Sequence, residues 1–226
     1  MKPLASISPA AGLLLPGLYC RLWCLCCLVL LTACSHDKPI YSPLEDDAVV
    51  LAFGDSITHG TGARSGEDYP TALAALTGWR IINAGIPGDT SRAATGRIAA
   101  TLGQHRPDLM ILELGGNDFL RQRQASAVKT DLRGIIRTAQ QAGTEVILMA
   151  VPRLSLARAQ LGVLEDSPIY AELAEEEGVP LFADSLSDIL SDDALRADRI
   201  HPNAEGYQQL AAALQQFLLQ QGFLAQ

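Results

Sequence analysis

The feature that most constrains the fold of this 226-residue chain is an alternation, after residue 48, of short apolar runs with longer segments of helical periodicity. Five runs are β-rich and apolar: Val49–Phe53, Arg80–Asn83, Leu109–Leu114, Glu145–Val151 and Val179–Ala183. The helical patterns cover Tyr69–Leu76, Ser91–Leu102, Ala125–Ala142, Ser167–Glu177 and Asn203–Leu219. Strands and helices that alternate in this way form a parallel sheet through right-handed crossovers. We therefore expect an α/β fold, a five-stranded parallel sheet with helices on both faces.

Three residues that are able to take part in catalysis or ligand binding follow the ends of three expected strands. Ser56 follows the first strand, Gly85 the second and Asn117 the third. Because ligands of open parallel sheets bind beyond the carboxyl ends of the strands, we expect these three residues to meet at one edge of the sheet.

Ser56 is a candidate nucleophile at the start of a helical turn, where backbone N–H groups favour nearby negative charge. The alternative for this Gly-Asp-Ser segment is that Asp55 or Ser56 merely caps the turn. Asn117 follows two glycines, and its amide is a donor of the kind that an oxyanion hole uses. Asn117 and Asp118 are also compatible with a simple helix cap. Gly85 has no Cβ to obstruct its own N–H, and Asp89 or Thr90 after it is expected to cap the next helix.

His201 is the candidate general base, since imidazole exchanges protons near neutral pH. Asp198 lies three residues earlier and reaches the other ring nitrogen within one turn, where it fixes the tautomer. Pro202 suits the first turn of the last helix. His59 is the rival base because it is close to Ser56 in sequence, but it has no adjacent carboxylate.

The first 33 residues are expected to be a lipoprotein signal peptide rather than part of the fold. Leu22–Leu31 is continuously apolar and is too short for a spanning helix, which needs about 20 residues. The segment Leu31-Thr32-Ala33-Cys34 resembles a bacterial lipobox, which implies lipidation of Cys34. Residues 34–47 are interpreted as the lipidated cysteine and a tether, and residues 48–226 as a single domain. Ser35 favours the outer membrane over the inner one.

Composition excludes several classes of site and partner. All five cysteines lie within the first 34 residues, so the domain has no thiol nucleophile and no disulfide. No histidine is spaced with the surplus carboxylates as metal ligands are, so we expect no metal. Without Lys2 and Arg21 the chain has 15 basic and 25 acidic residues, which argues against nucleic acid as a partner. The sequence does not indicate an oligomeric state.

Taken together, four segments resemble the blocks of the SGNH (GDSL) hydrolase superfamily. They are Gly54-Asp55-Ser56, Gly85, Gly115-Gly116-Asn117-Asp118 and Asp198-x-x-His201-Pro202-Asn203. Segments 86–91, 113–121 and 200–203 are similar to those of the bacterial thioesterase I, arylesterase and lysophospholipase group. The resemblance implies a flavodoxin-like three-layer α/β/α fold and no cofactor. It also implies Ser56 as nucleophile, an Asp198–His201 pair, and an oxyanion hole from the N–H groups of Ser56 and Gly85 and the Asn117 side chain. The lipobox is a departure from that group.

The expected activity is hydrolysis of acyl or aryl esters, acyl-thioesters or lysophospholipids through an acyl-enzyme, at a cell envelope to which the lipid anchor attaches the chain. Two alternatives stay open. One is an O-acetylesterase that acts on an envelope polysaccharide. The other, from a different class, is an anchored envelope-binding lipoprotein without catalysis. The segment 152–166 has no assigned role.

Overall fold

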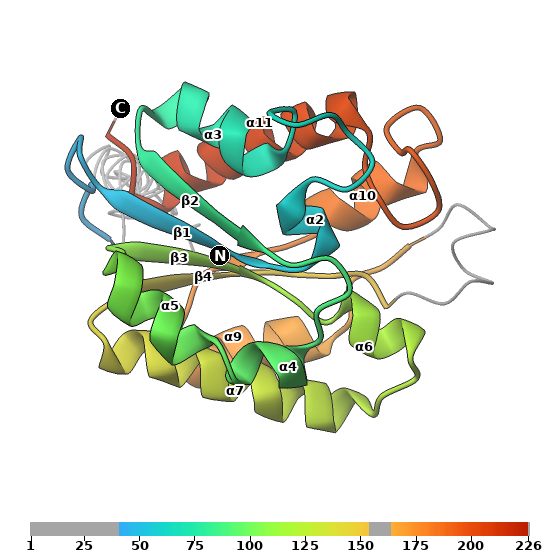
Figure 1. Ribbon diagram of the computed structural model, residues 1–226, viewed down its shortest axis with the longest axis horizontal. Coiled ribbons are helices and arrows are strands. Elements are labelled where there is room, and N and C mark those ends of the chain that lie inside the picture. Colours follow the sequence, from blue (N-terminus) through green and yellow to red (C-terminus); the bar gives the residue numbers. More distant parts are fainter. Residues whose placement is uncertain (1–40, 154–163, 226) are drawn as a thin grey trace, which may run out of the picture. The chain divides into compact units, whose positions relative to one another are not determined.

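The computed structural model describes residues 41–153 and 164–225. Its centre is a five-stranded parallel sheet in the order β2-β1-β3-β4-β5 (Figure 1). The strands are β1 (Val49–Gly54), β2 (Arg80–Gly85), β3 (Leu109–Glu113), β4 (Glu145–Met149) and β5 (Leu181–Phe182). The expected signal peptide and Cys34 lie outside the described residues.

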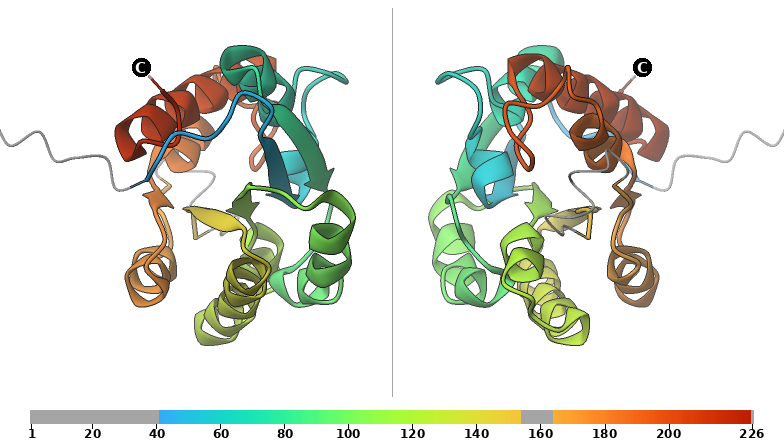
Figure 2. Two further views of the ribbon diagram at one scale, coloured as in Figure 1. Left: turned by 90° about the vertical axis from the view of Figure 1, so that its left-hand side faces the viewer. Right: turned by 90° about the vertical axis from the view of Figure 1, so that its right-hand side faces the viewer.

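Two layers of helices enclose the sheet, as the end-on views of Figure 2 show. One layer contains α3 (Tyr69–Thr77), α10 (Ser185–Ser191) and α11 (Ala204–Gln221). The other contains α4 (Ser91–Thr95), α5 (Ile98–His105), α7 (Ala125–Gln141) and α9 (Ile169–Glu177). Two short helices, α2 (Ser56–His59) and α6 (Gly116–Leu120), follow β1 and β3 directly. The predicted three-layer α/β fold is confirmed.

The core explains why these runs form strands. All five residues of β3 are buried, and Val50–Phe53 of β1 are fully buried as well. A strand that is covered on both faces needs apolar side chains in every position, which is the pattern of the sequence. In the register of the sheet, Gly54 stands beside Gly85 on one side and Glu113 on the other. The loops after β1, β2 and β3 therefore begin at the same level.

Two helical expectations were wrong in detail. The single helix expected over Ser91–Leu102 is broken into α4 and α5 at Gly96 and Arg97. At this break the Arg97 guanidinium bonds Asp89 and the carbonyl oxygens of Ala84 and Gly54. Helix α10 was not expected at all, because its seven residues are too few to display a clear period.

The described part of the expected tether, residues 41–47, is packed against the domain. The Tyr41 ring stacks on Phe223 with centroids 4.2 Å apart, and the Leu44 N–H donates to the Phe223 carbonyl at 2.9 Å. A stacked aromatic pair and backbone hydrogen bonds offset the entropy that a free linker would keep. The domain therefore starts several residues before residue 48.

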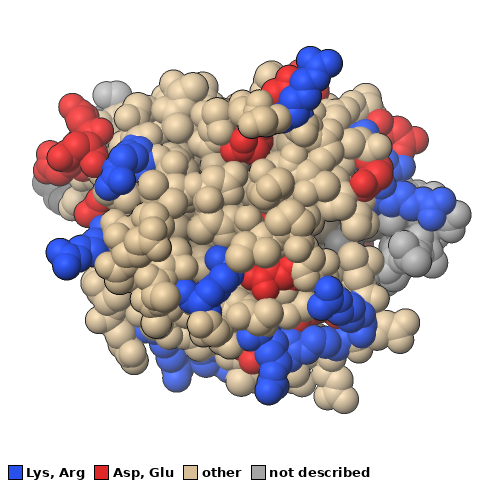
Figure 3. Space-filling model, in the orientation of Figure 1, with Lys and Arg blue, Asp and Glu red and all other residues tan. Residues whose placement is uncertain are grey.

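The surface carries charges of both signs. On the face shown in Figure 3, acidic and basic side chains are interspersed among uncharged residues. Within residues 41–153 and 164–225, no helix has the length and apolar character needed to cross a membrane.

Candidate active site

Ser56 is the first residue of α2, immediately beyond β1. The Asp55 side chain caps this helix, since its Oδ1 accepts the N–H of Ile57 at 3.1 Å. The capping reading is therefore right for Asp55, and it leaves the Ser56 hydroxyl available for another contact. That contact is with the imidazole of His201, at 3.0 Å from Oγ to Nε2.

The loop that precedes α11 brings the imidazole to the serine. Asp198 Oδ2 lies 2.8 Å from Nδ1 of His201, and Asp198 Oδ1 accepts the backbone N–H groups of Ile200 and His201. Partial burial acts to raise the pKa of Asp198, but its hydrogen bonds with His201 and Ile200 outweigh burial and leave this pKa below its ordinary value. The carboxylate is therefore anionic at neutral pH and orients one tautomer of the ring.

The same loop is held against the segment that follows α2. The Tyr207 hydroxyl of α11 donates to the Thr61 carbonyl at 2.7 Å. Gly62 has a φ of +101°, and a Cβ there would lie 2.4 Å from the Pro202 carbonyl oxygen. This close approach places His201 beside Ser56, although the two are 145 residues apart. His59, the rival base, is exposed at the end of α2 and makes no hydrogen bond to Ser56 in the described residues.

Asn117 approaches the serine from α6. Its Nδ2 donates to Asp55 Oδ2 at 3.0 Å, so the carboxamide is held over the turn that carries Ser56. Asn117 does not cap α6, because the N-cap position is Gly115, with φ +124°. A Cβ on Gly115 would lie 2.2 Å from the Tyr170 hydroxyl, which explains why the turn between β3 and α6 has glycine at this position.

Gly85 does not fit the role expected of it. Its N–H donates to Asn83 Oδ1 at 3.0 Å, so that N–H is not free for an oxyanion. A Cβ at Gly85 would lie 2.2 Å from the His59 backbone nitrogen, so the glycine serves the close packing of β2 against α2. Sequence reasoning placed a glycine at the correct strand end but had no means of telling where its N–H points.

Glu113 is a site residue that the sequence analysis did not single out. It ends β3, is 0% exposed, and its Oε2 accepts the Thr58 hydroxyl at 2.9 Å and the N–H groups of Asp55 and Thr58 at 3.3 Å each. Burial, and then the charge of Asp55, raise the pKa of Glu113 well above its ordinary value. Burial likewise raises the pKa of Asp55, to about 6, against the hydrogen bonds that lower it. The sequence feature that could have identified Glu113 is an acidic residue at the end of an otherwise apolar strand.

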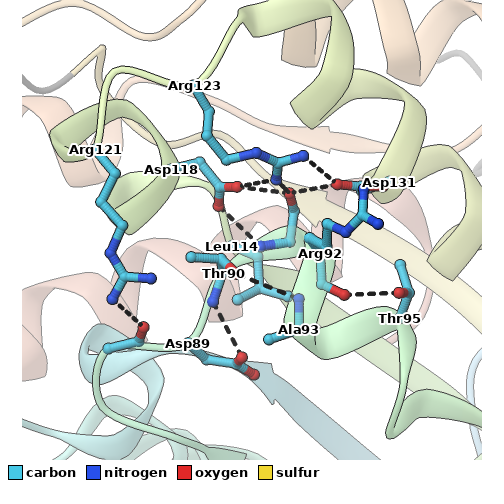
Figure 4. A network of polar contacts seen from close by, with 12 residues as sticks. Asp89, Thr90, Arg92, Ala93, Thr95, Leu114, Asp118, Arg121, Arg123 and Asp131 are labelled. Atoms are coloured by element: carbon cyan, nitrogen blue, oxygen red, sulfur yellow. Dashed lines mark hydrogen bonds and ion pairs between the residues drawn. The ribbon is translucent and has the colours of Figure 1, made fainter.

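A polar network attaches helix α6 to the turn that connects β2 with α4 (Figure 4). Asp118, fully buried, accepts the N–H of Ser91 at 2.8 Å and its hydroxyl at 2.9 Å. Arg123 bridges Asp118 and Asp131. Arg121 donates to the Gly88 carbonyl at 3.1 Å. Thr90 caps α4, as expected. These contacts give Asp118 a structural role, different from that of its neighbour Asn117.

A small pocket opens at the serine. Its polar side contains Asp55, Ser56, Glu113, Asn117 and His201. Its apolar side is formed by Leu120, Val151, Pro152, Leu186, Leu190 and Ile200. Apolar side chains therefore stand next to the polar reacting centre.

Known proteins are similar to this chain in sequence and in fold. The chain is 34% identical over 161 residues to thioesterase 1/protease 1/lysophospholipase L1 of Escherichia coli K12, which covers 69% of this chain and 76% of that protein. The crystal structure of TesA superposes with a TM-score of 0.67 at 25% identity, over 75% of this chain and 97% of TesA. The crystal structure of AlinE4, an SGNH-hydrolase family esterase, superposes with a TM-score of 0.58 at 32% identity, over 78% of this chain and 97% of AlinE4.

The family model described as GDSL-like lipase/acylhydrolase matches residues 52–209. This region extends from β1 into α11 and contains every strand end and loop from which the site is built. The chain therefore belongs to the GDSL-like lipase/acylhydrolase family.

Proposed function

We propose that Ser56, His201 and Asp198 perform the ester hydrolysis of this SGNH serine esterase. The observation that carries the proposal is the continuous contact from Asp198 Oδ2 to His201 Nδ1, at 2.8 Å, and from His201 Nε2 to Ser56 Oγ, at 3.0 Å. A hydroxyl in contact with an oriented imidazole is an activated nucleophile.

The reaction begins when Ser56 Oγ attacks the ester carbonyl carbon and its proton passes to His201 Nε2. The tetrahedral intermediate collapses, the imidazolium returns the proton to the leaving alcohol or thiol, and an acyl-serine remains. Water, deprotonated by His201, then attacks the acyl-serine; the second tetrahedral intermediate collapses to the free acid, and the imidazolium returns the proton to Ser56 Oγ. Asp198 stabilises the imidazolium in both halves.

The proposed oxyanion hole uses the Ser56 N–H and one N–H of the Asn117 carboxamide. The other Asn117 N–H holds Asp55, which fixes the direction of the group. In this scheme the third oxyanion donor is the N–H of Gly88 rather than that of Gly85. The Gly88 N–H meets no acceptor in the described parts of the chain. The turn that contains Gly88 is held to α6 by Arg121, four residues beyond Asn117.

The proposed substrates are acyl or aryl esters, acyl-thioesters or lysophospholipids. The apolar side of the pocket suits an acyl chain, and the related proteins are named thioesterase, lysophospholipase and esterase. The relatives do not favour the polysaccharide O-acetylesterase or the non-catalytic lipoprotein. A scan of acyl-chain length separates the proposed esterase from the O-acetylesterase. Activity that is retained from butyrate to longer p-nitrophenyl esters supports the proposal, and a steep preference for acetate supports the O-acetylesterase.

We also propose that residues 1–33 are removed and that Cys34 is lipidated, which attaches the enzyme to a bacterial envelope membrane, the outer one by the Ser35 rule. The support is the lipobox in the sequence. In bacteria fed radiolabelled palmitate, the wild-type chain should carry label and a Cys34→Ser variant should not. Equal labelling of both would reject the anchor.

Fluorophosphonate labelling tests the nucleophile directly. The wild-type protein should react at one serine, and Ser56→Ala should remove all labelling while the fold remains. Ser65→Ala, at an exposed serine of the loop after α2, is the matched control and should label like wild type. Labelling of Ser56→Ala at another serine would reassign the nucleophile.

A further inference from the structure

Two carboxyl groups are buried side by side beneath the proposed oxyanion donor. Asp55 is 2% exposed and Glu113 is 0% exposed, and the Asp55 backbone N–H donates to Glu113 Oε2 at 3.3 Å, so the two acidic residues are direct neighbours. Two ionised carboxylates so close together in a buried place repel each other, and this repulsion is relieved when one of them carries a proton. We therefore expect one of the two carboxyl groups to be protonated.

The other contacts of the pair identify which group carries that proton. Both Asp55 oxygens accept N–H groups, Oδ1 from Ile57 and Oδ2 from Asn117. Glu113 Oε2 accepts three donors, whereas Glu113 Oε1 receives no N–H or O–H group from the described residues. A buried oxygen without a donor is costly as an anion but satisfied as an O–H donor. The proton therefore belongs on Glu113 Oε1.

We propose that Glu113 is a positioning residue, a neutral carboxylic acid whose Oε1 proton is donated to Asp55, so that Asp55 stays anionic and holds the Asn117 carboxamide in place for the oxyanion. The inference rests on the proposed role of Asn117. A hydrogen bond to an ionised acceptor is about twice as strong as a neutral one. A neutral Glu113 also spares the oxyanion a second nearby negative charge.

The surroundings agree with a single negative charge at this place. The titratable groups that face the pair are the hydroxyls of Tyr69, Tyr170 and Tyr207, all buried, together with His201. Burial, the largest cause, raises the pKa of Tyr170 well above its ordinary value, so this group does not ionise near neutral pH. His201 is the one member of this set that gains a positive charge, and it does so during the reaction. The Asp55 anion then helps to stabilise the imidazolium.

Infrared spectroscopy tests the proton without any substrate. The difference spectrum of wild type minus Glu113→Gln at pH 7 should contain the carbonyl stretch of a protonated carboxylic acid, shifted in D₂O. Wild type minus Glu175→Gln, which changes an exposed glutamate, should contain no such band. A spectrum with only carboxylate bands for Glu113 would overturn the proposal while leaving the proposed esterase function intact.

Kinetics test the positioning role. Glu113→Gln keeps the shape, the neutral charge and a donor to Asp55, so its kcat should stay close to wild type. Glu113→Leu removes the donor, and its kcat should fall on the order of 10- to 100-fold, less than loss of the oxyanion donor itself, with KM unchanged. Fluorophosphonate inactivation, which forms a tetrahedral adduct, should slow by the same factor.

The comparison of the two variants decides between roles. If Glu113→Gln loses as much kcat as Glu113→Leu, the residue acts as an anion and the proposal is wrong. A leucine variant that folds and turns over like wild type would also reject it. If the leucine variant does not fold, Asp55→Asn replaces it: this change keeps the cap on α2 but opposes Asn117 with a second amide donor, so it should lower kcat with KM unchanged. Wild-type turnover there would count against the proposal.

Discussion

Gly54, the first residue of the Gly-Asp-Ser segment, is constrained by space rather than by backbone conformation. A Cβ on this residue would lie 2.0 Å from Thr58 Oγ1 and 2.7 Å from Glu113 Oε2. The missing side chain is the room in which the Glu113 carboxyl reaches the turn that carries Ser56. The Glu113 carbonyl oxygen would lie 2.5 Å away as well, and contacts under 3.0 Å with three polar atoms in a close-packed region cannot be relieved by a small shift.

Gly54→Ala should therefore lower the free energy of unfolding by about 1–3 kcal/mol and reduce kcat, because overpacking moves Glu113 and the helix start. The matched control is Gly134→Ala on the exposed face of α7, where a Cβ meets nothing within 4 Å. That change should stabilise by about 0.5–1 kcal/mol, since alanine is the better helix former. Urea denaturation of both variants gives the comparison. An alanine at position 54 without loss of stability would show that the turn can relax.

Asn117→Ala should lower kcat on the order of 10²–10³-fold, because one donor to the oxyanion is lost. The KM for p-nitrophenyl esters should change little, since the donor acts mainly on the tetrahedral intermediate. Stopped assays with p-nitrophenyl butyrate and a thermal melt measure both effects. Turnover at the wild-type rate would remove Asn117 from the oxyanion hole.

The raised pKa of Glu113 has a consequence for stability. A carboxyl whose pKa is higher in the folded state stabilises the fold fully below its unfolded pKa, and this contribution is lost as pH rises toward the folded value. Wild type should therefore lose up to about 1.4 kcal/mol per pH unit relative to Glu113→Gln, from about pH 4.5 upward. Urea midpoints at pH 5, 6 and 7 measure the difference. A difference that does not change with pH would mean that the pKa of Glu113 is not raised in the folded state.

At this scale, the sequence predicted residues whose role depends on local chemistry. Asp198 and His201 are three residues apart, so their pairing was visible in the spacing, and Ser56 followed a strand. Glu113 and the N–H of Gly85 depend on neighbours from other strands, which spacing does not reveal.

Among the elements, α7 and α9 are joined by a row of ion pairs. Lys129, Arg133 and Arg137 are spaced four residues apart on α7, so they lie on one helix face. They contact Glu172, Glu176 and Glu177 of α9. The sequence analysis placed these glutamates in the helical segment Ser167–Glu177 without assigning them partners. Its partners could not be inferred, because no pattern in the sequence says which helices are neighbours in a layer.

Glu177 is the best enclosed of these carboxylates, with a side chain 6% exposed. Hydrogen bonds from Arg137 lead the causes that lower its pKa. Glu177→Gln should therefore cost about 1 kcal/mol at pH 7, less in high salt, and nothing once the pH falls below the lowered pKa. Glu175→Gln, two residues away and exposed, is the control and should be neutral. Equal melting temperatures for the two variants at pH 7 would mean that the ion-pair row contributes nothing.

Over the whole molecule, alternation of strand and helix predicted a parallel sheet and the edge at which the site would form. The strand order was not predicted, because an apolar run does not encode its neighbours. The order β2-β1-β3 puts β1, which is followed by Ser56, between the strands that are followed by the Gly88 turn and by Asn117. The turn after β2, α2 and α6 therefore lie together at one end of the sheet (Figure 1).

Helix α11 runs the length of the domain from the His201 loop to Phe223, which is about 27 Å for its 18 residues. Tyr41 is docked at its far end, where the Tyr41 N–H donates to the Gln221 carbonyl. The described chain thus enters and leaves the domain at the pole opposite Ser56. An enzyme coupled to a bead, an electrode or a fusion partner through either of those ends would keep the Ser56 pocket facing away from the support and accessible to substrate in solution.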